Sequence, residues 1–136
     1  MHKPTAFFLV GPTASGKSAV AHLLAAKCGC SVVSADSMNV YQGMDIGTAK
    51  PTLTERKQVV YHGLDVVGPT EAFHVAAWVQ AIQPAWSEAS PPLVCGGTGL
   101  YVKCLTEGLN FFAPEDRAQR SVWEMQSLET LQVEAE

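Results

Sequence analysis

The sequence is poor in charged and aromatic side chains, which make up 16% and 8% of its 136 residues. It has no apolar run near the roughly 18 residues that a membrane-spanning helix needs. The apolar stretch after residues 1–4 is too short for the core of a secretory signal peptide, and it leads into a glycine-rich turn. We therefore expect neither a membrane protein nor a secreted one, and predict a cytoplasmic location.

Cysteine is also scarce and lacks the spacing of a metal or disulfide site. The chain contains Cys28, Cys30, Cys95 and Cys104, with no C-x-x-C pair and no histidine pair at metal-ligand spacing. Reduced thiols are the expectation for a cytosolic protein. A redox or metal-binding pair at Cys28 and Cys30 is the minor alternative.

Arginine occurs only at Arg56, Arg117 and Arg120. Nucleotide kinases use several cationic groups to clamp the transferred phosphoryl group, so this scarcity argues against a complete kinase. Residues 1–110 carry seven basic and seven acidic side chains, whereas residues 111–136 carry two and six. The net charge of −4 therefore belongs to the end of the chain, and a local basic patch on the neutral remainder is still compatible with a polyanionic partner.

Apolar residues are abundant at 47%, which predicts a folded domain with a core rather than a disordered chain. Their pattern alternates between strands and helices. Strands are expected at residues 5–10, 31–35 and 92–95, with a strand or extended segment at 61–67. Helices are expected up to residue 28, over 73–90 with a break at Pro84, up to 107, and from 114 toward 129. Residues 37–58 are polar and irregular.

This alternation predicts an α/β fold, a parallel sheet flanked by helices with its ligands at the carboxyl ends of the strands. Residues 5–10 are apolar throughout, so we expect that strand to be buried on both faces.

A phosphate-binding loop is the most specific local feature. The run Gly11-Pro-Thr-Ala-Ser-Gly-Lys-Ser18 matches G-x-x-x-x-G-K-[ST] in full, between an expected strand and an expected helix. There, backbone N–H groups cradle phosphate oxygens, Lys17 adds positive charge and the Ser18 hydroxyl meets Mg²⁺. The predicted di- or triphosphate contacts are Gly11, Pro12, Thr13, Ala14, Ser15, Gly16, Lys17 and Ser18. A glycine turn used only for packing would not explain why Lys17 and Ser18 follow Gly16.

Two further features follow the other expected strands. Asp36 ends strand 31–35 and should face the same crevice as the phosphate loop. It fits an indirect Mg²⁺ ligand, a general base or hydrogen-bond acceptor for a nucleophile, or a cap of the following turn. The turn Gly96-Gly-Thr-Gly99 fits either close approach to a ligand or a tight connection. The strand before it lacks a terminal acid, which makes ATP hydrolysis less expected.

Taken together, these motifs make the chain resemble the tRNA dimethylallyltransferases, which prenylate an adenine beside the anticodon. Four blocks carry the resemblance: the phosphate loop, Ser34-Ala-Asp-Ser-Met-Asn-Val-Tyr41, Gly43-Met-Asp-Ile-Gly-Thr-Ala-Lys-Pro51 and Gly96-Gly-Thr-Gly-Leu-Tyr101. Tyr61-His-Gly-Leu-Asp65 is a looser match. The phosphate loop alone is generic, whereas the third and fourth blocks together are highly specific. The likeness extends from Thr5 to Arg120.

The resemblance implies that dimethylallyl diphosphate binds with its diphosphate in the loop. The N6 amine of an adenine, flipped out of the anticodon loop of a tRNA, then displaces diphosphate from the allylic carbon. Lys17 and Ser18, the latter with Mg²⁺, would neutralise the leaving group, Thr13 would position it, and Asp36 would accept the N6 hydrogen. The implied tRNA contacts are Asp36, Ser37, Met38, Asn39, Thr98 and Arg120. Tyr41 and Tyr101 fit base stacking or the core equally well, and a monomer is expected.

Members of that family are much longer than this chain. Residues 1–112 would form a phosphate-loop core domain of the P-loop NTPase-like type, and residues 113–136 a helical acidic tail that begins an inserted or C-terminal region. We therefore expect a truncated fold, either a fragment or a truncated gene product. Three other functions stay open: an adenylate prenyltransferase that makes cytokinin, a small nucleotide kinase that binds ATP, and a non-catalytic domain that binds diphosphate.

Overall fold

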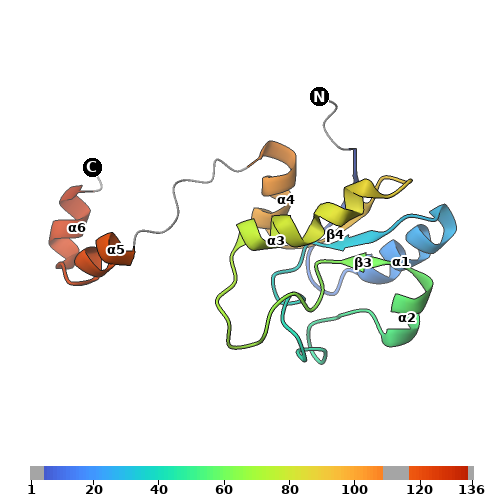
Figure 1. Cartoon of the computed structure of the whole chain (residues 1–136), viewed down its shortest axis with the longest axis horizontal. Helices are drawn as coiled ribbons and strands as arrows, with labels where there is room; N and C mark the ends of the chain where they lie inside the picture. The colour runs from blue at the N-terminus through green and yellow to red at the C-terminus, as the bar shows by residue number, and fades with distance from the viewer. Residues whose placement is uncertain (1–4, 109–116, 135–136) are drawn as a thin grey trace.

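The computed structural model describes residues 5–108 and 117–134 (Figure 1). Its parallel sheet has four strands in the order β1-β4-β2-β3. The strands are β1 (Phe7–Val10), β2 (Val32–Ser34), β3 (Tyr61–His62) and β4 (Leu93–Gly96). The helices are α1 (Lys17–Cys28), α2 (Leu53–Gln58), α3 (Val75–Ile82), the 3₁₀-helix η1 (Gln83–Ser87), α4 (Gly99–Glu107), α5 (Arg117–Glu124) and α6 (Leu128–Glu134). The expected α/β fold is confirmed.

Strand β4 forms the centre of the sheet and pairs in register with β1 and β2. Helices α3 and α4 cover one face of the sheet and α1 covers the other (Figure 1). On the first face, Trp78 stacks on Tyr101 with ring centroids 4.2 Å apart, and its indole Nε1 donates to the Ser34 carbonyl. Both rings are buried, so Tyr101 is a core residue, and Tyr41 packs against the same cluster.

Several local predictions are confirmed. Helix α1 ends where Gly29 adopts a left-handed conformation and its N–H bonds the Ala25 carbonyl. The helix that contains Pro84 splits into α3 and η1, because proline cannot donate the helical hydrogen bond. Helix α4 stops at Gly108, where φ is +77°.

The strand predicted at residues 5–10 forms as β1, but the prediction that it is buried on both faces is wrong. Phe7 is 61% exposed, and Phe8 and Val10 are exposed as well. Among the described strands β1 pairs only with β4, so it lies at an edge of the sheet. An apolar sequence shows that a strand can be buried, but its neighbours decide whether it is.

Two helix predictions also need correction. Residues 37–58 are not irregular throughout, because Thr52 and Glu55 form a capping box that starts α2. The last helix is not continuous: α5 ends at Glu124, and the Ser127 hydroxyl accepts from the Thr130 N–H at the start of α6. The predicted start at residue 114 and the boundary at residues 112–113 lie outside the described residues.

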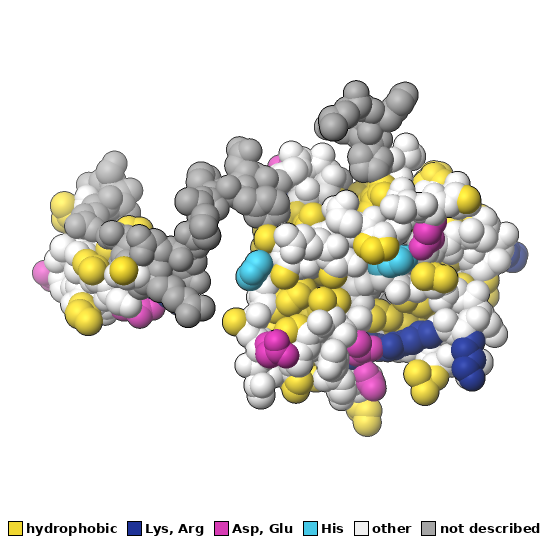
Figure 2. Space-filling view, in the orientation of Figure 1, with side chains coloured by type: hydrophobic (Ala, Val, Ile, Leu, Met, Phe, Trp, Pro, Cys, Tyr) yellow, Lys and Arg dark blue, Asp and Glu magenta, His cyan; other side chains and the backbone are white. Residues whose placement is uncertain are grey.

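All four cysteines are free thiols, so Cys28 and Cys30 do not form a disulfide. Nowhere in residues 5–108 and 117–134 is a helix long and apolar enough to cross a membrane. On the face drawn in Figure 2, basic side chains lie in a small group beside acidic ones rather than forming a broad basic surface.

Candidate active site

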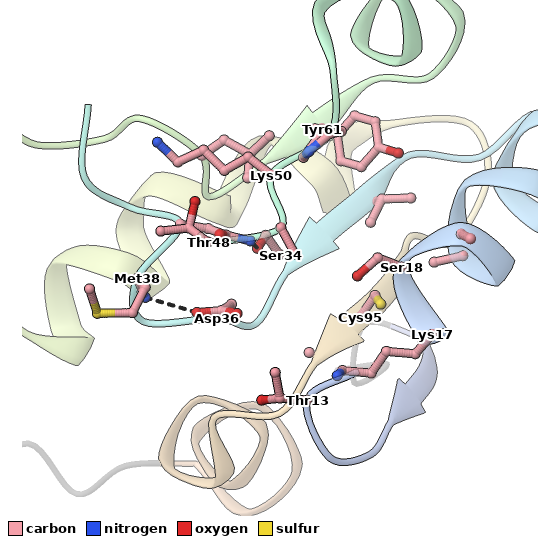
Figure 3. A pocket seen from close by; sticks show the side chains of 18 of the residues that line it. Thr13, Lys17, Ser18, Ser34, Asp36, Met38, Thr48, Lys50, Tyr61 and Cys95 are labelled. Atoms are coloured by element: carbon pink, nitrogen blue, oxygen red, sulfur yellow. Dashed lines mark hydrogen bonds between the residues drawn. The ribbon is translucent and has the colours of Figure 1, made fainter. Parts of the chain in front are cut away.

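A pocket of about 500 Å³ opens at the carboxyl ends of β2 and β4, beside the start of α1 (Figure 3). The phosphate loop forms one wall and the segment 47–51 forms another. Side chains that line it include Thr13, Lys17, Ser18, Ser34, Asp36, Met38, Asn39, Thr48, Lys50, Tyr61 and Cys95. A pocket therefore lies at the sheet edge where ligands were predicted.

The phosphate loop has the backbone geometry of an anion-binding turn. Ala14 and Gly16 have φ values of +62° and +81°, and Gly16 is the N-cap of α1. Because Gly16 has no side chain to cap the helix, the first N–H groups of α1 are left for an anion. The Lys17 ammonium donates to the Pro12 carbonyl at 2.9 Å, which places the positive charge against the loop.

The glycines at 96 and 97 allow three backbone segments to meet at this site. A Cβ on Gly96 would lie 2.2 Å from the Ala35 carbonyl oxygen, and one on Gly97 would lie 3.0 Å from the Gly11 carbonyl oxygen. Separations this short admit no side chain at Gly96 without a backbone shift. The turn therefore draws the end of β2 and the phosphate loop together.

Asp36 follows β2 and lies across the pocket from Lys17 and Ser18 (Figure 3). Its Oδ1 accepts from the Met38 N–H at 2.9 Å, which orients the carboxylate. The Thr98 hydroxyl accepts from the Ser37 N–H at 3.0 Å, so α4 also holds this turn. Asp36 therefore caps its own turn, which is one of its predicted interpretations, and its side chain lies in the same crevice as the phosphate loop.

The other predicted tRNA contacts lie in different surroundings. Ser37 and Met38 are both exposed, and Met38 lines the pocket. Asn39 is only 7% exposed, and its amide Nδ2 donates to the Ser34 hydroxyl. Arg120 lies on α5, outside the residues that line the pocket, and its Nε donates to Glu124 at 2.8 Å.

Sequence reasoning missed an ion network behind the pocket wall. The Lys50 side chain is 1% exposed, and its ammonium pairs with Asp65 at 2.7 Å and Asp45 at 3.0 Å. Arg56 contacts the second Asp65 oxygen at 2.6 Å. Lys50 and Asp65 belong to matched sequence blocks, but no local pattern could show that residues this far apart would pair.

The network keeps its groups charged. Burial raises the pKa of Asp65, but hydrogen bonds from Lys50 and Arg56 outweigh it and bring that pKa below its usual value. Burial lowers the pKa of Lys50, yet its bonds to Asp65 and Asp45 leave the pKa above the usual value. Lys50 is therefore a neutralised cation, and Lys17 is the other lysine that lines the pocket.

Tyr61 forms part of the pocket lining and was not predicted as a site residue. Its hydroxyl lies 2.9 Å from His22 Nδ1, and His22 Nε2 lies 3.1 Å from Gln58 Oε1. Burial raises the pKa of Tyr61 to about 12, so the phenol stays protonated. Cys95, at the end of β4, also stays a thiol at neutral pH because burial raises its pKa.

No group of three or more His, Cys, Asp or Glu side chains in the described residues could hold a metal ion. A magnesium ion here would need oxygen ligands from a bound phosphate compound together with the Ser18 hydroxyl, which is a suitable hard donor. The Ser18 side chain lines the pocket next to Lys17, so the residues present fit such an ion.

The fold and the loop define a phosphate-loop α/β protein with an acidic side chain facing its anion site. The sequence model of the IPP transferase family matches residues 39–135, and that of an isopentenyl transferase family matches residues 4–61. The chain belongs to the IPP transferase family.

Its relatives include curated tRNA dimethylallyltransferases. The chain is 45% identical over 122 residues to that of Desulforudis audaxviator, covering 87% of this chain and 39% of that protein. It is 45% identical over 117 residues to that of Burkholderia multivorans, covering 83% and 36%. The chain thus spans about two-fifths of the length of these relatives.

Solved structures of similar proteins support the same family assignment. A full-length tRNA isopentenylpyrophosphate transferase from Bacillus halodurans superposes with a TM-score of 0.74 at 38% identity, covering 90% of this chain and 42% of that one. A eukaryotic dimethylallyltransferase described as acting on tRNA superposes with a TM-score of 0.71 at 27% identity, covering 90% and 32%. The phosphate-loop fold is therefore that of the family.

Proposed function

We propose that this chain forms the donor and acceptor site of a tRNA dimethylallyltransferase. The reaction transfers the dimethylallyl group from dimethylallyl diphosphate to N6 of the adenine 3′ to the anticodon. One observation carries the proposal: the phosphate loop and Asp36 line the same pocket from opposite sides. A phosphate site needs only the loop, whereas transfer to an amine also needs an acceptor for its proton.

The loop holds the leaving group. The N–H groups at the start of α1 and the Lys17 ammonium stabilise the negative charge that grows on the diphosphate as its bond to the allylic carbon breaks. Thr13 lines the same wall and positions the diphosphate. A Mg²⁺ ion, when bound, would neutralise charge on the diphosphate, and Ser18 is the residue that would hold it.

Asp36 acts on the other side of the pocket. Its carboxylate accepts a hydrogen bond from the N6 amine and aims the nitrogen lone pair at the allylic carbon. As the N–C bond forms, one N6 proton passes to the Asp36 carboxylate. The exposed Ser37 and Met38 of this turn would contact the RNA, together with the Thr98 hydroxyl. The buried side chain of Asn39 supports this turn through its hydrogen bond to the Ser34 hydroxyl.

The first test is thermal unfolding with ligands. A ligand that binds only the folded chain stabilises it by about 2.7 kcal/mol at 100 times its Kd. We expect the melting temperature to rise with Mg²⁺ plus dimethylallyl diphosphate and to change little with Mg²⁺ plus ATP. A rise with ATP alone would indicate a kinase-like protein. Binding of the prenyl diphosphate without transfer to any acceptor would indicate a non-catalytic domain.

Adenylate is the second candidate acceptor, because a free nucleotide needs little basic surface and the face drawn in Figure 2 has no broad one. The two acceptors are distinguished by supplying labelled dimethylallyl diphosphate with either AMP or an RNA hairpin that carries an anticodon loop. Transfer to the hairpin alone supports the tRNA enzyme. Transfer to AMP alone would replace it with the adenylate prenyltransferase.

A further inference from the structure

The buried ion network lies next to the turn that carries Asp36. The Asp65 backbone N–H donates to the Asn39 carbonyl at 3.0 Å, and the Asn39 N–H donates to the Asp36 carbonyl at 3.2 Å. From the other direction, the Gln42 side-chain amide donates to the Asp65 carbonyl at 3.1 Å. A continuous path of hydrogen bonds therefore runs from Asp65 to Asp36.

Asp65 also contacts two further segments through its carboxylate. One oxygen accepts from Lys50 at the end of the 47–51 wall, and the other accepts from Arg56 on α2. The Arg56 Nε in turn donates to the Pro51 carbonyl at 3.1 Å. The Lys50 ammonium also contacts the Tyr41 carbonyl, in the segment that follows the Asp36 turn.

The backbone is strained where this network acts. Ala49 and Asp65 have φ values of +51° and +52°, a region that residues with a side chain seldom occupy. Such conformations persist only where the surroundings enforce them, and they are frequent at ligand sites. Ala49 lines the pocket and precedes Lys50, so the ion pair restrains both strained positions.

Resting on the proposed function, we propose that Asp65 is a positioning residue for the acceptor side of the pocket. Its carboxylate, held by Lys50 and Arg56, locks the 47–51 wall and the Asp36 turn in one arrangement. Asp65 does not line the pocket itself, so it acts through Asp36 rather than on substrate. The phosphate loop makes none of these contacts among the described residues and should be insensitive to the network.

Amide hydrogen exchange in the full chain provides the test, with D65N as the variant and D45N as the matched control. Asp45 pairs with the same ammonium but is 65% exposed and is not on the path to Asp36. In D65N, exchange of the Met38 and Asn39 amides should quicken at least tenfold, and that of Val33 and Val94 in the sheet should be unchanged. In D45N, the exchange rates of all four amides should match those of the wild type. Inorganic pyrophosphate, titrated with Mg²⁺, should bind D65N within twofold of the wild type.

Equal acceleration of the sheet amides, or an equal loss of pyrophosphate affinity, would reduce Asp65 to a general stability role and overturn the proposal. Unchanged Met38 and Asn39 exchange would overturn it too. If D65N does not fold, K50M gives the same readout, because Asp65 then keeps Arg56 alone. The K50M/D65N double variant should exchange no faster at Met38 than D65N, since both act through one contact.

Prenyl transfer adds a separate readout. D65N should lower kcat for transfer to the RNA hairpin by at least tenfold while KM for dimethylallyl diphosphate stays within twofold. A rise in KM for dimethylallyl diphosphate in proportion to the fall in kcat would contradict a positioning role for Asp65. If the wild type transfers no prenyl group, the proposed function fails, and the exchange rates at Met38 and Asn39 still decide the role of Asp65.

Discussion

At the scale of single residues, the site divides into groups that act on a ligand and groups that make room or hold position. Lys17 and Asp36 face the pocket with opposite charges from opposite walls. Gly96 provides close approach, since the backbone of Ala35 occupies the space a side chain would need. Asp65 and Lys50 neutralise each other behind the wall. Substituting each residue should therefore affect a different property: ligand binding, prenyl transfer or folding stability.

Substitutions of the two charged pocket residues should affect different steps, diphosphate binding for Lys17 and prenyl transfer for Asp36. We expect Asp36→Ala to lower prenyl transfer by at least ~100-fold, the scale of general acid–base catalysis, with pyrophosphate affinity nearly intact. Lys17→Ala should weaken pyrophosphate binding directly. Calorimetric titration and single-turnover transfer measure the two effects. Equal losses of binding and transfer in Asp36→Ala would contradict its assigned role, and unchanged affinity in Lys17→Ala would contradict the phosphate cradle.

Gly96 and Gly99 form a matched pair for testing whether the backbone of Ala35 leaves room for a side chain at position 96. Gly96→Ala should lower the free energy of unfolding by about 1–3 kcal/mol, or prevent folding, because the new Cβ would clash with Ala35. Gly99→Ala meets nothing within 4 Å at the start of α4 and should be neutral or stabilising by up to about 1 kcal/mol. Urea unfolding of both variants measures this. A loss in Gly99→Ala as large as in Gly96→Ala would show that the clash is not the cause.

At the scale of elements, the helices begin and end where local chemistry dictates. Gly29 stops α1, Pro84 divides α3 from η1, and the Thr52–Glu55 capping box starts α2. Each signal involves residues within a few positions of one another, so a sequence can reveal it. The capping box is a local T-x-x-E pattern within a polar stretch, so the start of α2 is a feature that a sequence can reveal.

Helix α2 holds Arg56 in the ion network, so its cap should matter for stability. Thr52→Ala removes the hydroxyl that accepts from the Glu55 N–H and should cost about 1 kcal/mol in the free energy of unfolding. Thr54→Ala, an exposed change inside the same helix, should stay within about 0.5 kcal/mol of the wild type. Chemical denaturation compares the two, and equal effects would rule out capping as the reason.

At the scale of the whole molecule, distant segments meet around the end of β2. The phosphate loop, the Asp36 turn, the 47–51 wall and the start of α4 all converge there. Asp65 ties two of these segments to α2, so its ionisation should influence global stability.

The sign of the pH effect follows from the depressed pKa of Asp65. The folded state holds that carboxylate ionised more strongly than the unfolded chain does, so its stabilisation is present above the unfolded pKa near 4. It is lost as the pH falls through the lower folded pKa. The wild type should therefore exceed D65N in unfolding free energy at pH 7, and the gap should narrow toward pH 3. Urea titrations at both values measure it, and a gap independent of pH would show that the charge is not what stabilises.

Features that depend on neighbouring residues could be predicted from the sequence: the phosphate loop, the ends of α1 and α4, the break at Pro84, and the order of strands and helices along the chain. Tertiary structure alone decided the exposed position of β1, the burial of Asn39 and the pairing of Lys50 with Asp65. Those features depend on which strands flank one another and which loops meet, and they are set by packing between residues far apart in the chain. The candidate site combines both kinds, since local motifs supply its charges and long-range contacts hold them in place.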